Sequence, residues 1–255
     1  MQTIGKCKLC QLEKPLLNRS HIIPDFMYAS LFDKDHKLNK FAPADYIEGD
    51  KHISRPSSGE YESNLLCSQC DNEIIGRYET YARKALYSKV DETSDLPECE
   101  NFITNGGLKF TKCKNLHYKE FKLFLLSILW RASISNRDFF KEVNLGPYED
   151  TIRQMILSGD PKQEETFPIL MMTWLNDKSF ATDLVGQPGI NRKENGIRYI
   201  FPIAGVTYIY HISPVSLKKD LKEFILSSKN EATLLHIPEG KSKEFLMTYF
   251  GVNKS

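Results

Sequence analysis

Two C-x-x-C pairs constrain this chain more than any other feature. Cys7 and Cys10 stand in CKLC, and Cys67 and Cys70 stand in CSQC. The spacing lets both sulfurs of one tight turn face the same ion, and four thiolates are the set that a tetrahedral structural zinc needs. A redox pair would need a thioredoxin-like βαβ context, which is not evident around either pair. We therefore expect one structural Zn²⁺ on all four cysteines, with unrelated core cysteines as the alternative.

The residues around the pairs predict how the zinc segment folds. The first pair precedes the apolar Leu16 and Leu17, as in a zinc knuckle. The second pair enters a helix, because apolar residues of 71–88 recur at helical spacing. The helix start favours thiolates, since its dipole end is positive. A knuckle in front and a helix start behind form the arrangement of a treble clef. A zinc ion would add on the order of 10 kcal/mol of folding energy, so residues 1–90 are expected to form a zinc-binding domain.

The remainder of the chain predicts a mixed α+β domain over residues 91–255. A polar linker at 88–99 precedes a hairpin at 99–113, where Asn105-Gly106 favours a tight turn. Cys99 and Cys113 flank this hairpin and are expected to be free buried thiols that face each other across it. A central helix is expected at 118–140, with Arg131 and Arg137 on its margin, and further helices at 146–157 and 241–251. Antiparallel strands rich in β-branched and aromatic residues are predicted at 167–175, 180–186, 196–203, 206–212 and 232–237.

Composition and charge are those of a soluble globular protein. The formal net charge is +1, from 34 Lys and Arg against 33 Asp and Glu, so the balance neither requires nor excludes a nucleic-acid partner. The N-terminus has no apolar signal segment. The most apolar stretch, 121–134, is interrupted by Lys122 and Arg131 and is shorter than a membrane span. We expect a cytoplasmic protein with reduced thiols and no membrane partner.

The stretch Ser20-His21-Ile22-Ile23-Pro24 lies between the two cysteine pairs, just before a predicted helix. The order C-x-x-C, SHIIP, C-x-x-C over about residues 5–85 resembles the HNH endonuclease family of ββα-metal nucleases. The resemblance implies a structural zinc, a histidine that activates water, an asparagine that orients this histidine, and a carboxylate and a later histidine that bind a catalytic cation. His21 matches the first histidine. Ser20 stands where an aspartate is usual, Glu62 where the asparagine is usual, and Asp71 where the later histidine is usual.

The candidate site follows from these matches and from proximity in sequence. His21, Glu62 and Asn64 are the catalytic candidates. A catalytic Mg²⁺ or Mn²⁺ would take carboxylates from Asp71, Glu73 and Glu79. Nucleic-acid contacts are expected from three cations on the tyrosine-rich helix after the second cysteine pair, namely Arg77, Arg83 and Lys84.

The expected function is metal-dependent hydrolysis of nucleic-acid phosphodiester bonds, with DNA as the expected substrate. The resemblance to compact HNH proteins with a second domain implies a role in restriction or anti-phage defence. The second domain would then serve in binding, regulation or oligomerisation, and the expected protein partner is a second copy of the chain or a defence-system protein. The alternative is an inactive treble-clef module that binds nucleic acid or a partner protein, in which His21 is a structural residue at the helix start. His36 and His52 are expected on the surface, and His117, His211 and His236 are expected to be structural.

Overall fold

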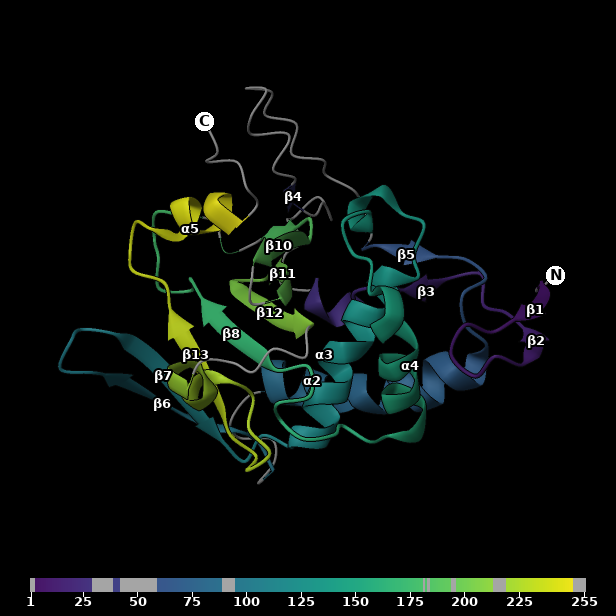
Figure 1. Cartoon of the computed structure of the whole chain (residues 1–255), viewed down its shortest axis with the longest axis horizontal. Coiled ribbons are helices and arrows are strands. Elements are labelled where there is room, and N and C mark those ends of the chain that lie inside the picture. Colours follow the sequence, from purple (N-terminus) through teal and green to yellow (C-terminus); the bar gives the residue numbers. More distant parts are fainter. Residues whose placement is uncertain are drawn as a thin grey trace.

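A large mixed β-sheet with helices on both of its faces, together with two separate two-stranded ribbons, makes up the described part of the fold in this computed structural model (Figure 1). The structure describes residues 3–28, 39–41, 59–88, 95–180, 182, 184–193, 196–212 and 219–249. His36 and His52 lie outside these residues. Within them the strand order is β4-β9-β11-β12-β8-β13-β7-β6, and β10 also pairs with β11. The strands are β4 (Asn39–Phe41), β6 (Glu98–Ile103), β7 (Lys109–Lys114), β8 (Ile169–Thr173), β9 (Leu184–Gly186), β10 (Gly189–Lys193), β11 (Gly196–Ile203), β12 (Val206–Ile212) and β13 (Ala232–His236).

The sheet confirms the predicted α+β class but is not wholly antiparallel. β13 pairs in parallel with β8, and β4 pairs in parallel with β9. The β11–β12 hairpin follows from its sequence, because Ala204 and Gly205 both have positive φ, as a tight two-residue turn requires. Strands are present within all five predicted ranges, but β9 covers only the end of 180–186, and neither β10 nor the parallel pairings were predicted.

Helix α3 (Tyr118–Ser133) is the spine of the molecule and packs between the sheet, α2 (Gly76–Tyr87) and α4 (Glu149–Ser158). Its apolar residues are not confined to one face, so it is buried almost all round. The predicted central helix is confirmed, but it ends at Ser133, and a 3-10 turn follows at Asp138–Phe140. The placement of Arg131 on the helix margin is wrong, because this side chain is only 1% exposed.

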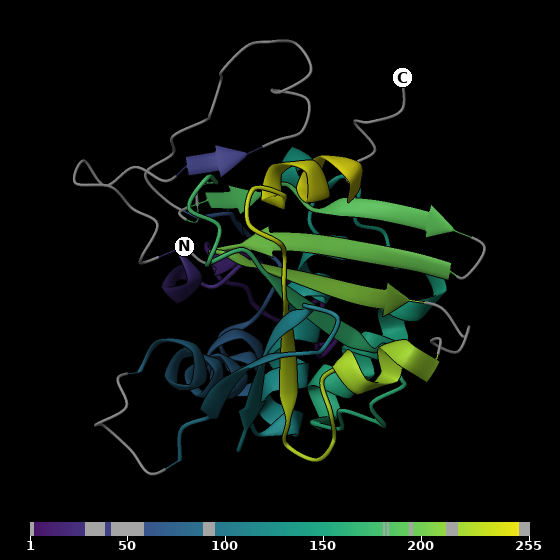
Figure 2. The same ribbon diagram turned by 90° about the vertical axis from the view of Figure 1, so that its left-hand side faces the viewer.

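The other sheet face is covered by two shorter helices, as Figure 2 shows. Leu221 and Phe224 of the 3-10 helix η6 (Lys219–Phe224) pack on a small cluster that includes Ile200 and Ile209. Phe245 of α5 (Ser242–Tyr249) packs on a second cluster around Trp174. The central strands are therefore covered on both faces, which explains their nearly continuous apolar sequences.

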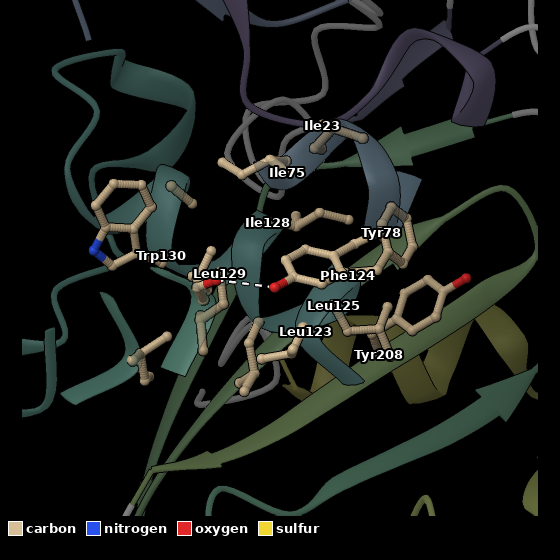
Figure 3. Packing of buried hydrophobic residues seen from close by; sticks show 14 of the residues in the cluster. Ile23, Ile75, Tyr78, Leu123, Phe124, Leu125, Ile128, Leu129, Trp130 and Tyr208 are labelled. Carbon is tan, nitrogen blue, oxygen red and sulfur yellow. Dashed lines mark hydrogen bonds between the residues drawn. The ribbon is translucent and has the colours of Figure 1, made fainter. Parts of the chain in front are cut away.

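The main buried cluster takes residues from both sides of residue 90. In Figure 3, Ile23, Ile75 and Tyr78 pack beside Phe124 and Ile128 of α3. Strand β4 likewise belongs to the sheet built from later residues. The division into domains at residue 90 stays a prediction, but the two parts share one core. No helix in the described ranges is long and apolar enough to cross a membrane.

The predicted hairpin at 99–113 is present as β6 and β7, but its cysteines are not free thiols. Cys99 and Cys113 are directly opposite each other in the strand register and form a disulfide. Cys113 is buried, whereas Cys99 is exposed. The prediction of two free buried thiols is therefore wrong, because facing positions of an antiparallel pair bring their side chains within bonding reach.

Replacing both hairpin cysteines by serine should lower the free energy of unfolding by about 3 kcal/mol, the chain-entropy value for a loop of this length. Urea unfolding of the wild type and of the double variant measures the difference, and intact-mass measurement shows whether two hydrogens are missing from the wild type. Equal stability, with a wild-type mass of two free thiols, would contradict the disulfide.

Lys122 is a buried cation on α3. Its Nζ donates to Tyr118 Oη at 2.8 Å and to the Gln163 carbonyl at 2.8 Å, and the residue is 1% exposed. Burial lowers the pKa of Lys122 to about 7, although the nearby carboxylates of Glu164, Glu165 and Asp160 act in the opposite direction. The folded chain therefore releases this proton at a lower pH than the unfolded chain does.

The Lys122 shift predicts a specific pH dependence of stability. Between about pH 7 and pH 10 the unfolded chain holds a proton that the folded chain has lost, so Lys122 makes stability rise with pH, by at most about 1.4 kcal/mol per unit. Chemical unfolding of Lys122→Met from pH 6 to 9 should lack this rise relative to wild type. Lys119→Met, which removes an exposed lysine of the same helix, should keep it. Parallel profiles for wild type and Lys122→Met would refute the assignment.

Candidate functional site

The four cysteines of the two C-x-x-C pairs form one compact cluster. The sulfurs of Cys7, Cys10, Cys67 and Cys70 all lie within 4.8 Å of one another. A tetrahedral zinc with Zn–S bonds of about 2.3 Å places its sulfurs about 3.8 Å apart, so the cluster fits such an ion. Among the described residues, no other group of three or more His, Cys, Asp and Glu side chains has its ligand atoms so close together. The predicted convergence of the cysteines is thus confirmed, and the cluster can hold a metal ion such as zinc.

Local backbone structure explains why the sulfurs converge. The strands β1 (Ile4–Lys6) and β2 (Glu13–Pro15) form a short hairpin, and Gln11 takes a positive φ in the turn between them. The Cys67 N–H donates to Cys7 Sγ at 3.4 Å, which joins the two pairs. Cys70 lies in the first turn of a π-helix, η3 (Gln69–Ile75), which continues into α2. The first pair thus lies in a two-stranded hairpin, and the second pair lies at a helix entrance as expected, although the first helical turns are wider than expected.

The electrostatics of the cluster favour a bound cation. Cys7, Cys67 and Cys70 are each no more than 2% exposed. Burial raises the pKa of Cys67 and Cys70, and the neighbouring Cys7 raises that of Cys70 further. The pKa of Cys7 itself is lowered, because backbone hydrogen bonds outweigh the effect of burial there. Four thiolates can therefore share this space only when a positive ion compensates their charge.

His21 lies on a two-stranded ribbon beside the cysteine cluster. Strand β3 (Ser20–His21) pairs with β5 (Tyr61–Glu62), so that Ser20 is opposite Glu62 and His21 is opposite Tyr61. The His21 Nε2 lies 3.0 Å from Asp25 Oδ1, but the contact is not aligned as a hydrogen bond. Burial lowers the pKa of His21, and the charge of Asp25 only partly offsets this. The imidazole is therefore neutral at pH 7, the form that accepts a proton.

Three buried polar atoms on β3 and at the start of η3 lack hydrogen-bond partners in the described part of the chain. They are Ser20 Oγ, His21 Nε2 and Asp71 Oδ1. Burial raises the pKa of Asp71 to about 6, whereas the nearby Arg131 and the Ser20 hydroxyl beside Asp71 lower it. Buried polar atoms without partners are costly, so each of these atoms is suited to contact an ordered water, a cation or a substrate group.

The Arg131 side chain reaches β3 and α2 from α3. Its Nη1 donates to the His21 carbonyl at 2.7 Å, and its Nη2 donates to Glu79 Oε1 at 2.8 Å. Glu79, a predicted cation ligand, is therefore already paired with a buried guanidinium. This role of Arg131 could not be predicted from the sequence, because periodicity alone does not distinguish a buried arginine from one at the edge of a helix face.

The other predicted site residues lie elsewhere. Glu62 accepts bonds from Ser135 Oγ at 2.6 Å and from the Asn136 N–H at 2.9 Å, and alternation along the strand directs it to the ribbon face opposite His21. Asn64 is exposed in a turn with a φ of 61°. Glu73 is exposed on η3. No contact joins any of the three to the His21 side chain in the described residues.

The predicted nucleic-acid contacts lie on α2. Arg77 is held by its neighbour, since its Nη2 donates to Tyr78 Oη at 2.6 Å, whereas Arg83 and Lys84 are exposed. A second basic group lies next to His21. The Arg19 guanidinium is 4.3 Å from the centre of the Tyr61 ring, and that of Arg137 is 5.9 Å from it. Asp25 and this arginine pair are site features that the sequence analysis missed. For Asp25, the one local signal in the sequence was its i, i+4 spacing from His21.

Comparison of the chain with protein-family models, with curated proteins and with solved structures finds no match.

The cysteine cluster predicts about one zinc ion per chain by elemental analysis. Cys67→Ser with Cys70→Ser should lose both the zinc and cooperative folding, because the ion joins two segments far apart in sequence. The Cys99→Ser, Cys113→Ser variant is the matched control and should keep its zinc. Wild-type protein that is fully folded without metal would contradict the zinc site.

Proposed function

We propose that this chain is a metal-dependent endonuclease whose N-terminal segment is a treble-clef module of the ββα-metal type. The observation that carries the proposal is the order of elements around His21. Strand β3 bears His21, β5 pairs with it, and the helix that begins at the second cysteine pair follows. This order agrees with the resemblance to HNH endonucleases found in the sequence.

The chemistry proposed for His21 is that of a general base. A neutral imidazole with an unpartnered Nε2 can take a proton from a water as that water attacks phosphorus. Asp25, whose Oδ1 is 3.0 Å from Nε2, would stabilise the imidazolium that forms.

Asp71 is the proposed ligand for the divalent cation. Its Oδ1 has no hydrogen-bond partner among the described residues, and Ser20 Oγ is the neutral oxygen beside it. Mg²⁺ and Mn²⁺ accept such oxygens. When bound, the cation would neutralise charge on the scissile phosphate.

The proposed substrate is nucleic acid, with DNA expected from the resemblance. Arg19 is exposed and has no acidic partner in the described ranges, and Arg137 is half exposed although it contacts Glu60 at 3.1 Å. These two arginines flank the Tyr61 ring, whose edge-on neighbour is His21 at 6.2 Å between ring centres. In this proposal they would contact phosphates next to the reacting one.

A second candidate function is supported by the pairing of Glu79 with Arg131. This pair removes one of the expected carboxylates from cation binding. The chain would then be a zinc-stabilised module that binds nucleic acid or a partner protein and has no nuclease activity.

The proposal predicts that zinc-loaded protein nicks supercoiled plasmid when Mg²⁺ or Mn²⁺ is added. His21→Ala should slow nicking by about 100-fold or more, the usual effect of removing a general base. Asp71→Asn should raise the concentration of cation needed for half-maximal rate. His236→Ala, which removes a histidine of β13 in the large sheet, is the matched control and should cut like wild type.

Two results decide against the nuclease. Plasmid left intact with every cation, by protein that still shifts DNA in a gel, would favour the non-cutting module. Equal nicking by wild type and His21→Ala would show that His21 is not the base.

A further inference from the structure

A polar cavity lies between the hairpin that carries Cys7 and Cys10, the end of α3 and the start of α4. Its volume is about 380 Å³, which is within the range of small-molecule sites. Lys6 and Lys8, on either side of Cys7, line it from the knuckle. Trp130 lines it from α3, and Glu149 and Arg153 line it from α4.

The charges of this cavity leave an excess of positive groups. Arg153 is paired with Asp150, at 2.7 Å from Nη2 to Oδ1, so these two residues neutralise each other. Glu149 already accepts a bond from Ser133 Oγ at 2.7 Å through Oε2. Lys6 and Lys8 have no acidic partner within the described part of the chain. Two free cations therefore face one carboxylate, which favours an anionic ligand.

The indole of Trp130 provides a second and independent observation. Trp130 is 1% exposed, and its Nε1 has no acceptor among the described residues. A buried N–H donor without a partner is rare, because leaving it unpaired costs about 1–3 kcal/mol. A ligand oxygen in the cavity would satisfy this donor.

We propose that this cavity binds a small phosphate monoester that also carries hydroxyl groups, such as a sugar phosphate or a nucleoside monophosphate. The phosphate takes the two lysines, whose charges match its own at neutral pH. The indole N–H donates to a ligand oxygen, and the remaining oxygen of Glu149 accepts from a ligand hydroxyl.

The site is separate from the proposed nuclease centre but joined to the zinc knuckle. Arg153 Nη1 donates to the carbonyl of Leu9, inside the first C-x-x-C pair, at 2.7 Å. A ligand that bridges the knuckle and α4 would reinforce this contact. Binding therefore stabilises the folded zinc protein by mass action.

Calorimetric titration of the zinc-loaded chain with AMP, with ribose 5-phosphate and with adenosine tests the proposal. Both phosphate esters should bind, and adenosine, which lacks the phosphate, should not. Lys6→Gln with Lys8→Gln should weaken AMP binding by about 10-fold or more, and Trp130→Phe by about 5-fold, as expected for two charged contacts and one neutral hydrogen bond. Lys109→Gln with Lys114→Gln, which removes two exposed lysines of β7 away from the cavity, is the charge-matched control and should bind like wild type.

Zinc content and thermal unfolding verify that each variant is folded, and the lysine variant alone suffices if Trp130→Phe is unstable. Absence of binding by both esters, equal binding of adenosine, or unchanged binding by the lysine variant would overturn the proposal. These readings need no divalent cation and no DNA cleavage, so they are independent of the nuclease test.

Discussion

The buried guanidinium of Arg131 fixes the site relative to the rest of the molecule. It donates within α3 to the Ser127 carbonyl at 3.2 Å, across to the His21 carbonyl and to the Glu79 carboxylate. Removing one partner of a buried ion pair costs about 3–5 kcal/mol, because the other charge is left uncompensated. The ribbon with His21, the helix α2 and the helix α3 can therefore shift relative to one another only at high cost. The geometry around His21 thus depends on a residue more than a hundred positions further along the chain.

This dependence explains why the N-terminal segment and the sheet domain share a core. A zinc ion on the four cysteines would fix the knuckle and the start of η3, but it would not bury the apolar side chains beyond them. Ile23, Ile75 and Tyr78 are all fully buried, and they pack in the cluster built around α3. The Tyr78 hydroxyl also donates to the Ile156 carbonyl of α4 at 3.0 Å. The later residues therefore supply the packing partners that bury the apolar side chains of the zinc segment.

Local patterns in the sequence predicted the elements well, and interactions between distant residues account for what they missed. The strands 196–203 and 206–212 match their predictions, because β-branched runs and the turn at Gly205 are local signals. The cysteine cluster was predictable because ligand spacing restricts its geometry. The parallel pairing of β13 with β8 and the burial of Arg131 depend on tertiary packing, which helical or strand periodicity does not encode. The same is true of Glu62, whose side chain caps the loop after α3.

Charge balance gives a physical meaning to Ser20 in the proposed site. Asp71, Glu79 and Arg131 together carry one net negative charge when both carboxyls are ionised, and burial already raises the pKa of Asp71 to about 6. An aspartate at position 20 would add another carboxylate to the same buried space, where like charges repel strongly. Serine avoids this repulsion and still offers an oxygen. In the proposed nuclease, the remaining charge would attract one divalent cation, with neutral oxygens such as Ser20 Oγ and water completing its coordination.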